Sequence, residues 1–304
     1  MHDVEAQIEA IEKAALIRPM PELGTVEVRG ADRLSWLAGM VTQHVAELKP
    51  GEGRYALHVT KTGRLVAELW VAVLEDRVLL GLDHERRDEI VGVMDRFLIM
   101  EDAELTVPSE PHGWWLAHGP AAEAVVAAAR AHGAAAVLGS LGDLPTAIIA
   151  APNEHVHNVG EALTQVDGSL LATPEGWERI RVERMLPRLG VDFDVDCYPQ
   201  EASLEKLAVS FDKGCYIGQE AVFMLEKRGH VNKRLVRLVA SDGAGIEPGQ
   251  DVTTADGEKV GAVTSVARAG ATTWALATVR YKQAANGTAL LVGSGGQAVT
   301  VSSP

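Results

Sequence analysis

The order of predicted strands and helices most limits the fold of this chain, because nearly the same series occurs twice. Between Thr25 and Val107, apolar spacing predicts a strand, a helix, three strands, a helix and a strand. Between Trp115 and Leu171 the series is a strand, a helix, two strands, a helix and a strand. Both runs approximate the β-α-β-β-α-β unit of ferredoxin-like domains. We therefore expect an α+β fold with two ferredoxin-like (split βαβ) units.

The rest of the chain has a different pattern. A helix is predicted after Pro174, through Met185, with its end near Pro187. From Arg234 onward, short alternating segments are separated by turns rich in Gly, Asp and Pro, which predicts a small barrel or sandwich. We expect three domains, the first two of which can exchange segments. They are residues 1–110, residues 111–232 and a C-terminal β-barrel of residues 233–304.

Composition excludes several classes of protein. The apolar fraction of 47% and the charged fraction of 23% are those of a globular protein. No uncharged apolar run approaches the roughly 20 residues of a membrane helix, and the N-terminus lacks the pattern of a secretory signal. The formal charge of −14 disfavours nucleic acid as a partner. Two cysteines, Cys197 and Cys215, favour a reducing compartment, and we expect a cytoplasmic location with no membrane partner.

Basic residues nevertheless gather in one stretch of this acidic chain. Residues 206–237 contain seven basic and only three acidic residues. The basic residues are Lys206, Lys213, Lys227, Arg228, Lys233, Arg234 and Arg237. Such a stretch can attract an anionic small molecule, or it can be a solvated charged face.

Eight consecutive residues within this stretch have the character of a functional site. They are Lys213-Gly214-Cys215-Tyr216-Ile217-Gly218-Gln219-Glu220, which we call the signature segment. The segment has no apolar period. Its two glycines allow backbone conformations or close approaches that other residues resist, and Lys213 and Glu220 are costly to bury unless they are paired or bound. We predict a loop that opens a helix near Gly218.

Other familiar chemistries find no support in the sequence. No Gly-x-Gly-x-x-Gly leads from a strand to a helix, and neither a Walker loop nor a Cys-x-x-Cys pair occurs. His155 and His157 are the closest histidines, but residues two apart on a helix do not face one another, so we expect no metal site. No nucleophile-elbow motif supports Ser-His-Asp catalysis.

The signature segment resembles that of the YgfZ family of folate-binding proteins, which is related to the glycine-cleavage T-protein, an aminomethyltransferase. Three further segments resemble the same family, so that the resemblance covers essentially the whole chain. They are Val26-x-Val28-x-Gly30-x-Asp32-Arg33-Leu34, Arg181-x-Glu183 with Leu189-Gly190-x-Asp192, and Arg228-Gly229-x-Val231-x-Lys233-Arg234. The resemblance implies three domains arranged as a ring, with tetrahydrofolate in the central opening.

The resemblance also implies which residues hold the folate. A pterin edge offers a pair of N–H donors that one carboxylate can accept together. Glu183 matches the family position for this role, and otherwise it is an exposed helix residue. Lys213 or Arg228 is expected to meet the anionic tail, or else to be a solvated surface cation. The other expected members are Gly214 and Tyr216 at the folate, and Gly218, Gln219 and Glu220 as signature positions.

Cys215 is the residue best suited to chemistry. A thiol beside Lys213 and near a helix start is expected to have a lowered pKa and more thiolate, which suits a redox, sulfur or metal-handling role. The alternative is a small buried core residue. Cys197 carries no such signature, and a disulfide between the two cysteines has no support in the sequence.

One departure from the T-protein bears on enzyme activity. The T-protein carries paired aspartates after a Gly-Gly turn, one of them near the folate nitrogens. The comparable stretch here, Gly63 to Leu69, has Ala67 at one of these positions and Glu68 at the other. Glu68 is longer than aspartate by one methylene, a shift that can lose a reactive geometry.

Three hypotheses from different classes follow. The leading one is a tetrahydrofolate-binding accessory protein that supports iron–sulfur cluster assembly or repair, with Cys215 doing or gating the chemistry. Its partners would be iron–sulfur client or assembly proteins. The second is a folate-dependent one-carbon (aminomethyl) transferase or demethylase that uses Glu68 or another carboxylate. The third is an interaction module that has kept the fold and lost the ligand.

Overall fold

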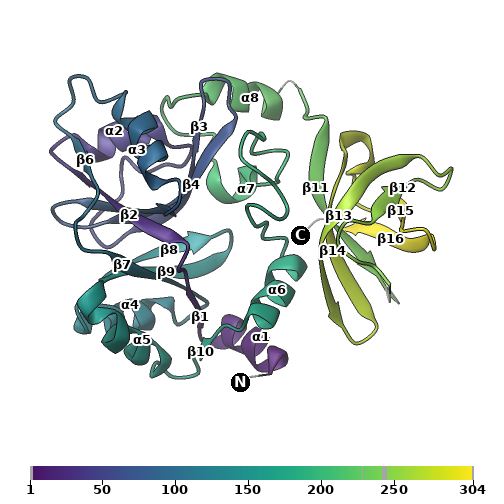
Figure 1. Cartoon of the computed structure of the whole chain (residues 1–304), viewed down its shortest axis with the longest axis horizontal. Helices are drawn as coiled ribbons and strands as arrows, with labels where there is room; N and C mark the ends of the chain where they lie inside the picture. The colour runs from purple at the N-terminus through teal and green to yellow at the C-terminus, as the bar shows by residue number, and fades with distance from the viewer. Residues whose placement is uncertain (1–2, 228, 242–244, 303–304) are drawn as a thin grey trace. The chain divides into compact units, whose positions relative to one another are not determined.

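Two five-stranded sheets and one closed barrel carry the fold (Figure 1). The computed structural model describes residues 3–227, 229–241 and 245–302. By its internal contacts the chain divides into two units. Unit 1 consists of Met1–Thr173 and Lys206–Gln219, and unit 2 of Pro174–Glu205 and Glu220–Pro304. Unit 1 contains both sheets, whereas unit 2 contains the barrel.

The first sheet of unit 1 confirms the first predicted run. Its strands are all antiparallel and lie in the order β3-β4-β5-β2-β6, so that the first and last strands of the run are neighbours. The strands are β2 (Leu23–Arg29), β3 (Gly53–Val59), β4 (Leu65–Val73), β5 (Val78–Asp83) and β6 (Glu104–Thr106). The helices are α2 (Arg33–Met40) and α3 (Arg87–Asp95). Strand β3 extends the ferredoxin-like unit at one edge.

The second sheet, in the order β10-β1-β7-β9-β8, confirms the second run and adds one strand. Its strands are β1 (Leu16–Pro19), β7 (His112–His118), β8 (Ala135–Leu141), β9 (Leu144–Pro152) and β10 (Leu170–Leu171). Its helices are α4 (Ala122–Ala131), η1 (Asn153–His155) and α5 (Val156–Thr164). Strand β1 lies between β7 and β10 and follows α1 (Val4–Lys13). Neither of these N-terminal elements was predicted.

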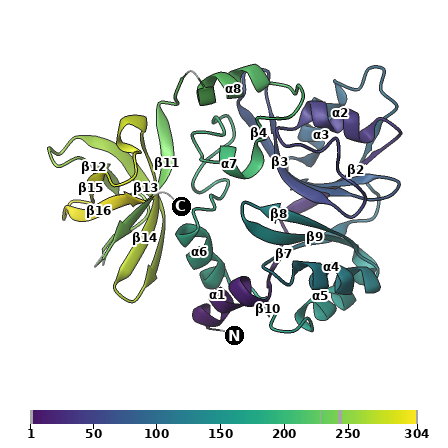
Figure 2. The same cartoon turned by 180° about the vertical axis from the view of Figure 1, so that it is seen from behind.

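Alternation along the strands explains how unit 1 is layered. One face of the first sheet packs on α2 and α3, and one face of the second sheet packs on α4 and α5 (Figures 1 and 2). The two remaining faces meet, and there the indole N–H of Trp114 donates to Thr25 Oγ1 at 2.9 Å. A Cβ on Gly81 would lie 2.9 Å from the Trp114 ring, so a glycine is needed at this contact. Unit 1 therefore has helices outside and two sheets face to face inside.

Unit 2 is built on the closed barrel, in the order β11-β14-β13-β12-β15-β16. The strands are β11 (Lys233–Ala240), β12 (Asp251–Thr253), β13 (Lys259–Ala269), β14 (Thr272–Arg280), β15 (Ala289–Val292) and β16 (Gln297–Ser302). Strand β15 was not predicted, and a turn at residues 293–296 joins it to β16. Helix α6 (Pro174–Glu183) packs on β13 and β14 (Figure 1).

Three further features complete the fold. Helix α6 ends at Glu183, earlier than predicted, because Met185 has a φ of 56° and so leaves the helical conformation. Two short helices, α7 (Glu205–Ala208) and α8 (Gln219–Lys227), each contain a boundary between the units. Within residues 3–227, 229–241 and 245–302, no helix has both the length and the apolar character to cross a membrane.

Candidate functional site

Lys213 fixes the signature segment to the end of α2. Its ammonium donates to the carbonyl oxygens of Ala38 at 2.6 Å, Val41 at 2.6 Å and Gln43 at 3.0 Å. Helix α2 ends at Met40, so Lys213 caps the negative end of the helix dipole. The side chain is buried, and desolvation lowers its pKa to about 8.

This geometry corrects the expectation that Lys213 meets the folate tail. An ammonium has three N–H donors, and all three are used by backbone carbonyls of unit 1. Tyr216 belongs to the same anchor, since Lys213 Nζ lies 5.0 Å from its ring centroid. Tyr216 is buried, and its burial raises the pKa of the phenol to about 12.

The backbone of the signature segment is held as closely as its side chains. The amide N–H of Ile217 donates to the Gly39 carbonyl at 3.0 Å. Gly218 has a φ of 79°, and a Cβ there would lie 2.2 Å from the carbonyl oxygen of Thr60. Gly218 therefore has both the backbone conformation and the close approach that were expected of the glycines. Gly214 has neither, because its φ lies outside the left-handed region and nothing in the described structure lies within 4 Å of an added Cβ.

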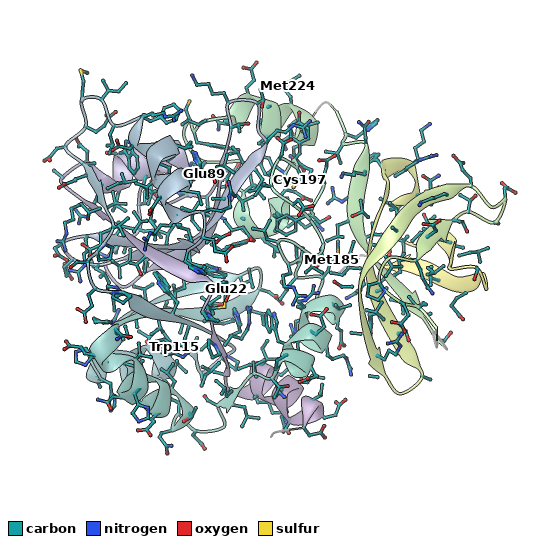
Figure 3. All side chains as sticks on the ribbon, in the orientation of Figure 1. Glu22, Glu89, Trp115, Met185, Cys197 and Met224 are labelled. Carbon is teal, nitrogen blue, oxygen red and sulfur yellow. The ribbon has the colours of Figure 1, made fainter. Side chains whose placement is uncertain are left out.

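The anchored residues leave Cys215 at the surface. Its side chain is exposed, which rules out the alternative of a buried core residue. Helix α8 begins four positions later, at Gln219, whose Nε2 donates to the Gly214 carbonyl at 3.5 Å. Glu220 is exposed in the first turn of α8. Among the described residues neither cysteine forms a disulfide, and Cys197 (Figure 3) is half-buried in unit 2.

Glu183 lies at the C-terminal end of α6, on unit 2. Its carboxylate oxygen Oε2 accepts a hydrogen bond from Arg179 Nε at 3.0 Å, and 36% of the side chain is exposed. The guanidinium of Arg237 donates to the main-chain carbonyl of Glu183. The guanidinium of Arg179 also lies over the Trp274 ring, 4.7 Å from its centroid. Glu183 is thus held by neighbours and is not a freely solvated helix residue.

A buried network beneath α6 fixes this helix to the barrel. Arg181 donates to Asp192 at 2.6 Å and also bonds Glu178 and Ser265. Asp192 further accepts from the Ser265 hydroxyl at 2.6 Å. The family-like pattern therefore contains a buried ion pair, Arg181 with Asp192, in addition to the Glu183 carboxylate at the end of α6. Sequence reasoning had assigned a role only to Glu183.

Glu68 combines partial burial with the neighbourhood of other carboxylates. It lies half-buried on β4, and the Tyr55 hydroxyl donates to its Oε1. Burial raises the pKa of Glu68 to about 7, the Tyr55 hydrogen bond opposes this rise, and the charges of Glu22 (Figure 3) and Asp83 add to it. The sequence pointed to Glu68, but nothing in it signalled Tyr55 or the two acidic neighbours.

The basic stretch proves to serve several purposes. Arg234 pairs with Glu205, and Arg237 also donates to Ser302 Oγ at 2.9 Å. Lys206, Lys227 and Lys233 are exposed, and an attraction for anions remains a prediction for them. Arg228, the other residue expected at the folate tail, lies outside the described residues. In the part of the chain that the structure describes, no three His, Cys, Asp or Glu residues are grouped as metal ligands.

Comparison with known domains matches both ends of the chain. Residues 1–136 match the GCVT N-terminal domain, and residues 232–304 match the CAF17 C-terminal beta-barrel domain. The first match covers the first sheet with part of the second, and the second covers the barrel.

Curated relatives are aminomethyltransferases. The protein from Halalkalibacterium halodurans is 27% identical over 124 residues, which are 40% of this chain and 34% of the relative. The protein from Bacillus subtilis matches over the same share, so the chain spans about a third of the length of these two relatives. The protein from Listeria monocytogenes is 24% identical over 255 residues, 77% of this chain and 70% of the relative.

A solved structure shares the fold over nearly the full length. The crystal structure of glycine cleavage system aminomethyltransferase T from Bartonella henselae has a TM-score of 0.79 and 18% identity, and the match covers 99% of this chain and 88% of that one. The chain therefore shares the fold of that aminomethyltransferase T structure and ends in a β-barrel that matches the CAF17 C-terminal domain. A GCVT N-terminal match followed by a CAF17 C-terminal barrel match is the domain architecture of the YgfZ/CAF17 family, which this chain therefore resembles.

Proposed function

We propose that this protein binds tetrahydrofolate and acts as an accessory protein in iron–sulfur cluster assembly or repair. The observation that carries the proposal is the union, in one chain, of a GCVT N-terminal domain with a CAF17 C-terminal barrel. The exposed thiol of Cys215, on a segment fastened at Lys213 and Gly218, supports a role outside simple folate binding. Iron–sulfur client or assembly proteins would be the macromolecular partners.

In this proposal, Glu183 binds the pterin ring. A carboxylate that accepts two N–H donors together forms a strong, oriented contact. The partial exposure of Glu183 and the support of its main-chain carbonyl by Arg237 suit such a role. Arg228 stays in the proposal as a partner of the folate tail, whereas Lys213 is left out because its donors are used.

A calorimetric titration with tetrahydrofolate tests the ligand. We expect Glu183→Gln to weaken binding roughly ten- to a hundredfold, because a charge-assisted pair is replaced by a neutral amide. Glu175→Gln is the matched control, since Glu175 is exposed in the first turn of the same helix. No binding by the unmodified protein would favour an interaction module that has lost its ligand.

The accessory role is tested in cells that depend on this protein. We expect Cys215→Ala to lower the activity of iron–sulfur enzymes, whereas Cys197→Ala, at a half-buried thiol, leaves it unchanged. Full activity with Cys215→Ala would refute the role of this thiol. Two cysteines that form no disulfide in the described residues support the proposal of a reducing, cytoplasmic location, and the acidic charge supports that of no nucleic-acid partner.

A second candidate function is folate-dependent aminomethyl transfer or demethylation. The observation that favours it is the pKa of Glu68, which lies near 7, where a carboxyl group can both give and take a proton. Turnover of a methylated amine to methylenetetrahydrofolate, lost in Glu68→Gln, would support it. The absence of tetrahydrofolate consumption with such donors would exclude it.

The division into residues 1–110, 111–232 and 233–304 also remains a proposal. One finding concerns the assignment of the signature segment to residues 111–232, because this segment is anchored to α2 and to the turn after β3. Those elements belong to the first run, as an exchange of segments between the first two domains would require.

A further inference from the structure

Arg179 contacts both the Glu183 carboxylate and the Trp274 ring. Its Nε donates to the carboxylate, and its guanidinium plane lies over the indole of Trp274. A weaker contact, 3.4 Å long, runs from its terminal nitrogen to the main-chain carbonyl of Arg268. Only 12% of the Arg179 side chain is exposed, so the guanidinium is largely covered by these neighbours.

The two contacts match the donor edge and the ring face of a pterin. A guanidinium is planar, offers N–H donors along an edge and stacks on aromatic rings. The pyrimidine end of a pterin is likewise planar and offers an amidine-like pair of N–H donors to a carboxylate. The Arg179 side chain therefore occupies both the acceptor, Glu183, and the stacking surface, Trp274, that such a ring would use.

We propose that Arg179 is a specificity-determining placeholder, which a ligand must displace from Glu183 and Trp274 in order to bind. The inference rests on the proposed binding of tetrahydrofolate at Glu183, and it adds Trp274 as the stacking surface for the ring. A planar ligand with a donor edge replaces both contacts. A ligand that carries only an anionic tail replaces neither, so Arg179 discriminates against it.

Trp274 is positioned to serve as such a surface. It stands on β14, half-buried beside Val182 and Met185 of the segment that ends α6. The network of Arg181, Asp192 and Ser265 fixes α6 on β13, the neighbouring strand. The indole and the Glu183 carboxylate are thereby held on one support, which the Arg181, Asp192 and Ser265 network forms without Arg179.

The experiment compares tetrahydrofolate binding in four variants by calorimetry. We expect Arg179→Met to bind roughly four- to tenfold tighter, since a helix ion pair and a cation–π contact no longer compete. Arg179→Lys keeps the charge but loses the planar fork, and should lie between Arg179→Met and the unmodified protein. Arg280→Met is the control, because it removes an exposed barrel ion pair with Glu258 that involves no aromatic ring.

The fourth variant, Glu183→Gln, separates the failure of this inference from the failure of the proposed function. If Glu183→Gln weakens binding and Arg179→Met leaves it equal or weaker, the placeholder is refuted and folate binding stands. If the unmodified protein binds tetrahydrofolate and Glu183→Gln has no effect, the ring does not bind at Glu183 and the placeholder is refuted with that assignment. If the unmodified protein does not bind tetrahydrofolate, the proposed function is refuted. Thermal unfolding of each variant shows that it is folded.

A second probe identifies the part of the ligand that Arg179 excludes. The probe is p-aminobenzoylglutamate, which has the folate tail without the pteridine ring. We expect its binding to be the same with and without Arg179→Met. An equal gain for the probe and for tetrahydrofolate would mean a general loss of electrostatic or steric hindrance, and would overturn the inference.

Discussion

Two buried cations anchor the two regions that carry the candidate site residues, and their charges are compensated differently. Arg181, on the buried face of α6, faces the carboxylates of Glu178 and Asp192. Lys213 in the signature segment faces carbonyl dipoles and the Tyr216 ring, which carry no full charge. A carboxylate compensates a buried cation more fully than neutral carbonyls do. The helix that carries Glu183 is therefore held by an ion pair, and loss of its cation leaves a buried charge uncompensated. The segment that carries Cys215 is held by a helix cap.

The largest effect is expected at Arg181. Arg181→Met leaves the fully buried Asp192 carboxylate without its counter-ion, and removal of one partner of a buried pair costs about 3–5 kcal/mol of unfolding free energy. Urea unfolding of the whole chain measures the loss. Arg280→Met, at an exposed ion pair, should change stability by less than about 1 kcal/mol. A similar, small loss in both variants would mean that the network beneath α6 is not an anchor.

Lys213→Met should cost less, about 2–4 kcal/mol. The substitution removes three hydrogen bonds but leaves neutral carbonyls, not a charge, without partners. The control is Lys206→Met at an exposed lysine of the same basic stretch, for which we expect a change within about 0.5 kcal/mol. A loss as large as that of Arg181→Met would contradict the distinction between an ion pair and a helix cap.

Glu68 extends the comparison to a half-buried acid whose hydrogen bond comes from a neutral hydroxyl, that of Tyr55. The pKa of this carboxyl is about 7, above the 4.5 of an ordinary glutamate. Well below pH 4.5 the carboxyl group is protonated in both the folded and the unfolded state, so no charge is buried on folding. As the pH rises from 4.5 to 7 the unfolded chain loses the proton first, so the folded state loses stability across this window, by about 2–3 kcal/mol in total.

Replacement of the carboxyl should remove this pH dependence. We expect the stability of Glu68→Gln, relative to the unmodified protein, to rise from pH 4.5 to 7 and then to stay level. Glu175→Gln, at an exposed carboxyl, should show no such trend. Parallel curves for Glu68→Gln and the unmodified protein would show that Glu68 is ionised at little cost, and would weaken the second candidate function.

The order of elements could be predicted because elements such as β4 and α5 carry apolar residues at strand or helix spacing. Strand β1 was missed because Leu16–Pro19 is short and contains Arg18 and Pro19, which interrupt any alternation. Strand β15, Ala289–Val292, is an apolar run of four residues without a period. Such strands are specified by the neighbours they pair with, and these lie elsewhere in the chain.

The site was predicted in part, for a related physical reason. The signature segment could be recognised because a cation, glycines and a thiol stand together, but residue type does not reveal what a cation faces. Lys213 turned toward the end of α2, a partner distant in sequence. The stack of Arg179 on Trp274 likewise joins residues that no local pattern connects.

The smallest effect is expected in the backbone of the signature segment, where its two glycines differ. Gly218→Ala forces a side chain into the left-handed region and against the Thr60 carbonyl, which should cost about 2 kcal/mol or slightly more. Gly214→Ala should change stability by less than about 0.5 kcal/mol, because it meets no neighbour and needs no special φ.

The two alanine variants therefore separate the anchored part of the segment from its exposed part. Gly218→Ala should disturb the fastening that Lys213 and Ile217 provide, whereas Gly214→Ala changes only the surface beside Cys215. If Gly214→Ala leaves stability intact yet lowers iron–sulfur enzyme activity in cells, its glycine serves an approaching partner and not the fold. Equal losses of stability in both variants would show instead that the whole segment is one structural turn, and that the exposure of its thiol is incidental.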